Sequence, residues 1–378
     1  MESVTDKQEL YLVTGAAGYL GNTLVKMLVS QGKRVRCLVL PGDETKAELP
    51  PQAEIFTGDI LCPESIAPCF QHQVDEPLYV IHCAGMVSIA TQFDQRVYDL
   101  NVTATDHILE MCRTYLVTRL IYVSSVHAIA EPPKGHLIRE TKTFDPALVT
   151  GCYAKAKAET TRNVMAAADQ GLPVVVVHPS GICGPYDYGR GNLTQLLIDY
   201  CKGHLAAGVD GGGYDFVDVR DVAQGIIAAC HKGRLGETYI LSNQYYPVRQ
   251  LLELFHQITG IRSIRSYLPL WFAKVTAPLS EVYYKLLRQP PLYTPYSLYT
   301  LTSNSRFSHA RQDGNHRAAD HRKYPPQQPA GNGNGQAQRQ PFSIFFNEFH
   351  LLLLHLSISF LIIKRQSDKI QLSYQIYQ

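Results

Sequence analysis

Two side chains suited to proton transfer, Tyr153 and Lys157, stand four positions apart in the sequence. On a helix this spacing places both on one face, whereas Lys155 points elsewhere. An ammonium group beside a phenol stabilises the tyrosinate and lowers the phenol pKa, so the pair predicts an acid or base that works near neutral pH. The same spacing is also typical of a solvated helix face.

A hydroxyl partner precedes this pair in the segment Leu120-Ile-Tyr-Val-Ser-Ser125, which has the pattern of a short strand. Open α/β sheets bind ligands at the carboxyl ends of their strands. We therefore expect Ser125 to hydrogen-bond a substrate oxygen and to orient Tyr153, with Ser124 as the weaker candidate. The three side chains together predict acid–base catalysis at a sheet edge.

A glycine-rich turn lies near the N-terminus, where residues 11–21 read Tyr-Leu-Val-Thr-Gly-Ala-Ala-Gly-Tyr-Leu-Gly between an apolar run and an amphipathic one. In such a turn the first glycine permits the tight bend, the second lets the backbone approach a pyrophosphate, and the third lets the helix pack on the strand. The helix N-terminus then attracts the phosphates. We predict a dinucleotide-binding turn with contacts from Gly15, Gly18, Tyr19, Leu20 and Gly21.

Two further segments are expected at the cofactor. Asp59 and Ile60 follow the third expected strand, where Asp59 either lies beside the adenine or caps a helix. Ala84 and Gly85 end the fourth expected strand, and their small size fits close approach of the backbone to the cofactor.

The residue that reads the adenosine ribose does not follow the usual pattern. An acid at the end of the second strand binds a 2′-hydroxyl, and an Arg accommodates a 2′-phosphate. Val39 and Leu40 occupy this place, Arg36 comes too early and Asp43 slightly late. The missing acid favours NADP slightly and leaves NAD open.

Alternating strand and helix patterns run from residue 8 to about 240 and predict an α/β fold, a Rossmann-type doubly wound parallel sheet with a smaller C-terminal substrate-binding lobe. The expected domains are a nucleotide-binding domain with the catalytic residues over 8–179 and a lobe with returning core segments over 180–307. The expected strands are Leu10–Thr14, Val35–Leu40, Glu54–Phe56, Leu78–His82, Leu120–Val123 and Pro173–His178, and the expected helices Asn22–Gln31, Val97–Thr114 and Tyr153–Gln170.

The C-terminal part of the sequence departs from this pattern. Residues 308–341 contain no Val, Ile, Leu, Met or Phe, which predicts a disordered polar tract. Residues 342–378 form an apolar tail of uncertain status, and within it 342–363 has the length of a membrane span but contains Asn, Glu and His. A membrane anchor, a buried or interfacial helix, and a frameshifted end not selected to fold all stay open.

The composition narrows the class of protein. The 378 residues are 45% hydrophobic, which excludes wholesale disorder, and the formal net charge of +2 argues against a nucleic-acid partner. Nine scattered cysteines without a C-x-x-C spacing argue against disulfides and a metal site. With no signal-peptide pattern at the start, these features predict a cytoplasmic protein.

The ordered motifs resemble those of the extended short-chain dehydrogenases/reductases in the NAD-dependent epimerase/dehydratase superfamily, especially dihydroflavonol-4-reductase-like and 3β-hydroxysteroid-dehydrogenase-like members. The motifs that carry this resemblance are T-G-A-A-G-Y-L-G (14–21), G-D-I (58–60), H-C-A-G (82–85), V-S-S (123–125), Y-A-K-A-K (153–157), H-P-S-G-I-C-G-P (178–185) and F-V-D-V-R-D-V-A (216–223).

The resemblance implies roles for matching residues. Ser125, Tyr153 and Lys157 match the family's catalytic trio, with Lys157 also holding the nicotinamide ribose, and Asn101 matches the asparagine that positions the lysine through water. Pro179 matches the loop near the nicotinamide, and Asp218 is expected to be structural. Helices near 97–114 and 153–170 often form a dimer contact in this family, so a homodimer is expected.

The expected reaction is hydride transfer between nicotinamide and a ketone, an aldehyde or a secondary alcohol as the small-molecule substrate. Val126 and His127 replace the acid pair that dehydratases of this family carry, and His127 is expected to be a rim or core histidine. Aromatic residues in the second half favour a less polar substrate; they are Tyr186, Tyr188, Tyr214 and Phe216. A nucleotide-sugar epimerase and a non-catalytic NAD(P)-sensing protein stay open as alternatives.

Overall fold

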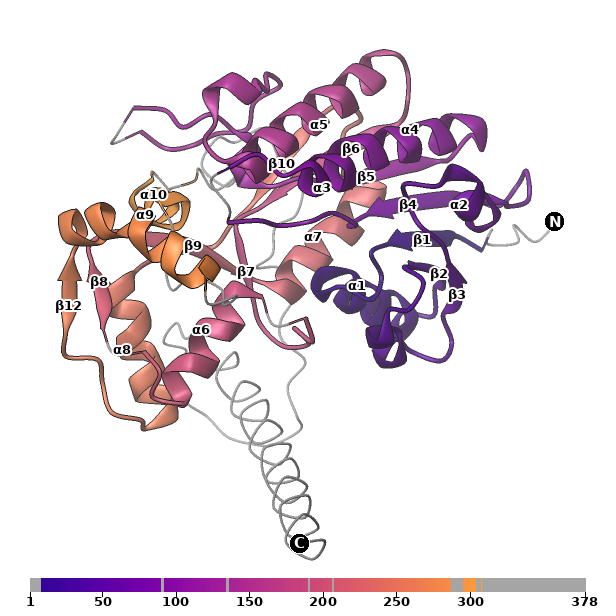
Figure 1. Ribbon diagram of the computed structural model, residues 1–378. Coiled ribbons are helices and arrows are strands. Elements are labelled where there is room, and N and C mark those ends of the chain that lie inside the picture. Colours follow the sequence, from indigo (N-terminus) through magenta and orange to yellow (C-terminus); the bar gives the residue numbers. More distant parts are fainter. Residues whose placement is uncertain are drawn as a thin grey trace, which may run out of the picture.

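The computed structural model describes residues 8–89, 92–133, 136–189, 191–205, 207–286, 295–303 and 307. A seven-stranded sheet forms its centre (Figure 1). All its strands are parallel, and their order is β10-β6-β5-β4-β1-β2-β3. The strands are β1 (Leu10–Thr14), β2 (Arg34–Val39), β3 (Glu54–Thr57), β4 (Leu78–His82), β5 (Arg119–Val123), β6 (Val174–Pro179) and β10 (Thr238–Leu241). The structure confirms the predicted Rossmann-type doubly wound α/β fold.

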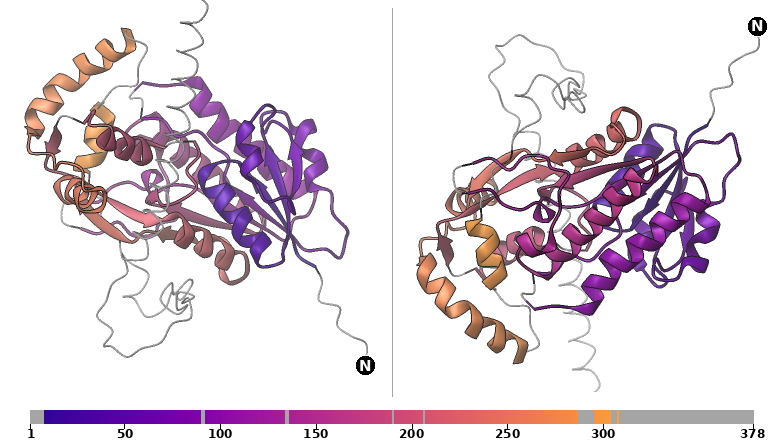
Figure 2. Two further views of the ribbon diagram at one scale, coloured as in Figure 1. Left: turned by 90° about the horizontal axis from the view of Figure 1, so that it is seen from below. Right: turned by 90° about the horizontal axis from the view of Figure 1, so that it is seen from above.

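Helices cover both faces of this sheet (Figure 2). They are α1 (Tyr19–Ser30), α2 (Pro63–Phe70), α3 (Gln95–Tyr98), α4 (Ala104–Thr114), α5 (Cys152–Asp169) and α7 (Val219–Lys232). Alternate residues of a strand point to opposite faces. Accordingly, Leu10 and Leu12 pack with α2, α4 and α5, whereas Tyr11 and Val13 pack with α1 and α7. Both faces are apolar because both are covered.

The predicted helix over Val97–Thr114 is divided. Residues Gln95–Tyr98 form α3, Asp99–Thr103 form a π-helical turn, and α4 starts at Ala104. Single π turns within helices frequently mark functional sites. This one contains Asn101.

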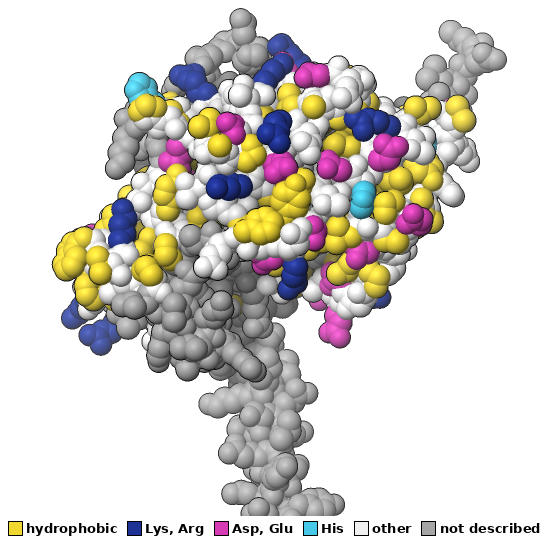
Figure 3. Space-filling model, turned by 45° about the horizontal axis from the view of Figure 1, so that its top comes forward, with side chains coloured by type: hydrophobic (Ala, Val, Ile, Leu, Met, Phe, Trp, Pro, Cys, Tyr) yellow, Lys and Arg dark blue, Asp and Glu magenta, His cyan; other side chains and the backbone are white. Residues whose placement is uncertain are grey.

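The remaining elements build a smaller lobe beside the carboxyl ends of the large sheet. Its strands are β7 (Gly181–Cys183), β8 (Gly208–Asp210), β9 (Gly213–Asp218), β11 (Gln244–Pro247) and β12 (Tyr267–Pro269), and its helices α6 (Asn192–Cys201), α8 (Val248–Thr259), α9 (Leu270–Leu286) and α10 (Pro295–Thr302). The chain returns to the large sheet through α7 and β10, so the lobe is not a separate sequence block. Figure 3 shows hydrophobic side chains gathered on its outer end, with Lys and Arg nearby.

Short 3-10 turns complete the described part: η1 (Glu44–Glu48), η3 (Val126–Ala128) and η4 (Pro146–Leu148). No helix among the described residues is long and apolar enough to span a membrane, and no group of metal-binding side chains occurs among them. The polar tract predicted over 308–341 and the apolar tail over 342–378 lie outside the described residues.

Candidate active site

The glycine turn between β1 and α1 is packed too closely to hold larger residues. Gly15 has a φ of +65°, and a Cβ there would lie 2.8 Å from the Ala84 backbone nitrogen. A Cβ on Gly21 would lie 2.1 Å from the Gly15 carbonyl oxygen. Gly18 precedes α1 without a side-chain cap, so the helix N-terminus, where Tyr19 and Leu20 begin α1, keeps free N–H groups for an anion.

The end of β2 offers no charged group to a ribose. Leu40 is 54% exposed there. Arg36 is held away from this place, because its guanidinium pairs with Glu54 and donates to the carbonyl oxygens of Cys69 and Gln71 at the end of α2. The Asp43 carboxylate accepts hydrogen bonds from the backbone and hydroxyl of Thr45.

Asp59 and Ile60 form the turn after β3. The Asp59 carboxylate accepts a hydrogen bond from the backbone nitrogen of Leu61 at 2.9 Å. Helix α2 has Cys62 at its N-cap, so the alternative that Asp59 caps this helix is wrong, and the carboxylate closes a turn instead. The placement of Asp59 beside an adenine stays a prediction.

Ala84 and Gly85 follow β4 and line the catalytic cleft. The Ala84 backbone nitrogen donates to the Thr14 hydroxyl at 3.3 Å. A Cβ on Gly85 would lie 2.7 Å from Asn101 Oδ1 and 3.5 Å from Lys157 Nζ. Only a residue without a side chain leaves this point open to a ligand.

Ser125, Tyr153 and Lys157 meet at the carboxyl end of β5. Ser125 follows β5, and Tyr153 and Lys157 share one face of α5. All three residues are buried. Lys157 Nζ donates to the Val123 carbonyl oxygen at 3.1 Å and lies 3.4 Å from the Tyr122 hydroxyl.

The pKa of the Tyr153 phenol differs from the expectation. Burial raises this pKa to about 12, although a hydrogen bond with the Ser125 side chain partly opposes the rise. Burial also lowers the Lys157 pKa to about 8. The predicted lowering of the phenol pKa is therefore wrong for the protein without ligand, because burial outweighs any effect of the ammonium group.

Asn101 supports the lysine side of the cleft. Its Nδ2 donates to the carbonyl oxygens of Met86 at 2.9 Å and Val97 at 2.8 Å. Its Oδ1 is buried without a hydrogen-bond partner among the described residues and faces the point over Gly85 that Lys157 also flanks. A buried acceptor of this kind calls for a donor from a ligand or water. Pro179 is the last residue of β6 and is buried, and its expected place near the nicotinamide stays a prediction.

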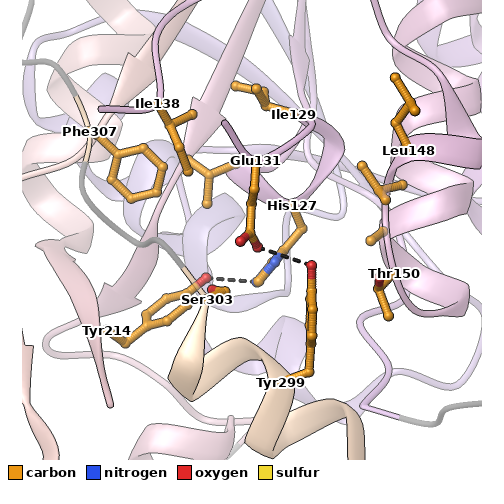
Figure 4. A pocket seen from close by; sticks show the side chains of 13 residues that line it. His127, Ile129, Glu131, Ile138, Leu148, Thr150, Tyr214, Tyr299, Ser303 and Phe307 are labelled. Carbon is orange, nitrogen blue, oxygen red and sulfur yellow. Dashed lines mark hydrogen bonds between the residues drawn. The ribbon is translucent and has the colours of Figure 1, made fainter. Parts of the chain in front are cut away.

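A cavity of about 30 Å³ lies next to this trio, between η3, the loop before α5, β9 and α10 (Figure 4). His127 projects into it and accepts or donates a hydrogen bond at Nε2 with the Tyr214 hydroxyl at 2.7 Å. The His127 ring packs edge-on against Tyr153, with ring centroids 6.3 Å apart. The lining residues are Val126, His127, Ile129, Glu131, Ile138, Leu148, Val149, Thr150, Ala154, Tyr214, Tyr299, Ser303 and Phe307.

Sequence patterns missed the tyrosines of α10. The ring of Tyr296 lies against Gly151 immediately before α5, and the Tyr299 hydroxyl donates to Glu131 at 3.4 Å. The local sequence around Tyr296 and Tyr299 does not predict these contacts, because α10 reaches the cleft only through the tertiary fold. Tyr186 and Tyr188 pack against Lys26 of α1, and their expected place near the substrate stays a prediction.

The comparisons with known proteins agree with this geometry. The model of the NAD dependent epimerase/dehydratase family matches residues 11–242. The chain belongs to this family. The sterol demethylase protein B of Methylococcus capsulatus is 30% identical over 304 residues, which cover 79% of this chain and 90% of that protein. A protein of Synechocystis sp. whose name assigns it as a dihydroflavonol 4-reductase is 28% identical, over 72% and 81% of the two chains.

The fold of the family is also seen in solved structures. The crystal structure of gox2253 superposes with a TM-score of 0.67 at 28% identity and covers 79% of this chain and 90% of its own. Relatives of the chain include reductases, dehydrogenases and epimerases. Membership of this family indicates NAD-dependent chemistry. Because the relatives catalyse different reactions, the reaction of this chain has to be inferred from its own site.

The residues of the site fit the family's nicotinamide cofactor. Gly15, Gly18 and Gly21 leave room for a pyrophosphate at the start of α1, and the space over Gly85 is bordered by Asn101 and Lys157. When bound, a nicotinamide dinucleotide supplies or accepts the hydride.

Proposed function

We propose that the protein is an NAD(P)-dependent oxidoreductase that acts on a neutral, largely apolar ketone or aldehyde, or on the corresponding secondary alcohol. The lining of the cavity beside Ser125 and Tyr153 carries this proposal. Nine of its side chains are apolar or aromatic, and the polar ones are His127, Glu131, Thr150 and Ser303. No Lys or Arg is among the lining residues that the structure describes. A nucleotide-sugar epimerase must hold a diphosphate, which proteins bind with cationic side chains or helix N-termini.

The chain's own groups account for the proton. With its pKa raised to about 12, Tyr153 keeps its hydroxyl proton at neutral pH and can donate it to a carbonyl oxygen that becomes an alkoxide. Ser125 hydrogen-bonds the same oxygen and orients the phenol. Lys157, with a pKa of about 8, is largely protonated at pH 7 and stabilises the tyrosinate that remains.

The test is a turnover assay with the purified protein. NADH and NADPH are offered separately with a panel of neutral ketones and aldehydes, and cofactor oxidation is followed. We expect turnover with at least one carbonyl compound and its loss in Tyr153→Phe, with cofactor binding retained. Cofactor binding without oxidation, unchanged by this substitution, would support the NAD(P)-sensing alternative. Cofactor retained through purification, with turnover of nucleotide sugars, would support an epimerase.

The cofactor preference and the assembly are further parts of the proposal. NADP is proposed as the preferred cofactor because Val39 and Leu40, at the end of β2, offer no acid to bind a ribose 2′-hydroxyl. The ratio of kcat/KM for NADPH and NADH tests this. A homodimer through α4 and α5 is proposed from the resemblance, and light scattering after size-exclusion chromatography tests it. A cytoplasmic location is likewise proposed, and cell fractionation tests it.

A further inference from the structure

His127 is fixed from three sides beside the catalytic residues. The backbone nitrogen of His127 donates a hydrogen bond to Ser125 Oγ at 3.2 Å, and this bond ties η3 to the catalytic serine. Its ring stacks on Tyr214 with centroids 5.8 Å apart and packs edge-on against Tyr153. These contacts hold the imidazole in one orientation beside Tyr153.

The hydrogen bond to Tyr214 sets the position of the imidazole proton. Burial raises the pKa of the Tyr214 phenol and lowers that of His127 to about 4, so both groups are neutral at pH 7. A phenol is the stronger donor of such a pair and a bare imidazole nitrogen the stronger acceptor, so Tyr214 donates to Nε2. The proton of the neutral ring is then on Nδ1.

The Nδ1 atom has no hydrogen-bond partner among the described residues, and the ring that carries it points into the cavity between Glu131, Tyr214 and Tyr299 (Figure 4). The volume of about 30 Å³ is the room of one or two water molecules. This space beside the imidazole suits a small substituent of a substrate.

We propose that His127 is a specificity-determining residue whose Nδ1–H hydrogen-bonds an oxygen on the carbon next to the reacting carbonyl. The preferred substrate class is therefore a neutral α-oxygenated ketone, such as an α-alkoxy or α-hydroxy ketone. Tyr214 is a positioning residue that keeps the imidazole in this tautomer. This inference rests on the proposed oxidoreductase function, because it describes the substrate of the same site.

Matched substrates separate the hydrogen bond from general reactivity. The full-length protein with its cofactor is assayed with acetophenone, α-methoxyacetophenone and α-hydroxyacetophenone, or with an equivalent series built on a ketone that the wild type reduces. The methoxy oxygen only accepts hydrogen bonds, so it probes the Nδ1–H donor alone. The measured quantity is the ratio of kcat/KM for the methoxy ketone to that for the parent ketone, in the wild type and in each variant.

Two substitutions of His127 form a matched pair. The amide of His127→Asn reaches the place of Nδ1 and retains the preference, whereas the amide of His127→Gln reaches the place of Nε2 and loses it. We expect the ratio to fall roughly fivefold in His127→Gln, the usual effect of one neutral hydrogen bond, and to fall less in His127→Asn. Tyr214→Phe is expected to lower the ratio, because the imidazole loses the hydrogen bond that sets its tautomer. A general loss of structure would lower kcat/KM for both ketones alike and leave the ratio unchanged.

The outcomes distinguish this inference from the proposed function. Equal ratios in the wild type and His127→Gln, with thermal unfolding showing both variants folded, would overturn the role of His127 and leave the oxidoreductase function standing. A preference for the hydroxy ketone alone would overturn the assignment of the proton to Nδ1. If the wild type oxidises no reduced cofactor with any ketone, the proposed function itself fails.

Discussion

Replacing Lys157 with Met is predicted to stabilise the cofactor-free protein at pH 7. Lys157 is 5% exposed, and burial lowers its pKa from 10.5 to about 8. At 1.36 kcal/mol per pKa unit, this lowering means that the folded state destabilises the charged Lys157 by about 3 kcal/mol relative to the neutral form. Loss of the hydrogen bond from Lys157 to the Val123 carbonyl oxygen costs about 1 kcal/mol of stability. The expected net gain is about 2 kcal/mol.

The stability difference between Lys157→Met and the wild type is expected to depend on pH. Because the folded pKa lies below the unfolded one, the unfolded state binds more protons between pH 8 and 10.5, and the wild type gains stability as the pH rises through this window. The advantage of Lys157→Met is therefore full below pH 8 and disappears towards pH 10.5. Comparing the two proteins at each pH cancels the titration of the other groups.

The assay is urea unfolding of both proteins without cofactor, followed by circular dichroism between pH 6 and 10. Lys155→Met is the control, because Lys155 lies on the same helix with an exposed side chain and is expected to leave stability nearly unchanged. A Lys157→Met protein that is less stable than the wild type at pH 7, or a difference that does not vary with pH, would refute the reasoning. The same variant is expected to lose turnover, since it lacks the ammonium group beside Tyr153.

Three further predictions concern the cofactor cleft and the lobe. Gly21→Ala is expected to weaken cofactor binding at least tenfold in calorimetry, because its Cβ would overlap the Gly15 carbonyl oxygen; unchanged affinity would contradict the role of the turn. Asp218→Ala is expected to lose about 1 kcal/mol of unfolding free energy, because Asp218 caps α7, and to leave kcat within about twofold. Arg36→Ala is expected to leave the NADPH to NADH preference unchanged, because its guanidinium pairs with Glu54; a shift in the kinetic ratio would place Arg36 at the ribose.

Much of the nucleotide-binding half was predictable because its signals are local. The expected strands Leu10–Thr14 and Leu78–His82 agree with β1 and β4 at both ends, and the other expected strands of the sheet differ by one residue at one or both ends. Helix α5 begins one residue before Tyr153 and brings Lys157 to the same buried face, as the spacing predicted. Asp218 proved to be a helix cap, in agreement with its expected structural role.

The sequence by itself determined where the chain turns, which face of each strand is apolar and which residues share a helix face, since these depend on neighbours within a few positions. Only the tertiary structure decided the surroundings of the site. Burial from all sides raises the Tyr153 pKa, and α10 brings Tyr296 to the start of α5 from far along the chain. The bond between His127 and Tyr214 joins two segments 87 residues apart. The local periodicity of the sequence does not predict such contacts, because they form only when distant segments pack together.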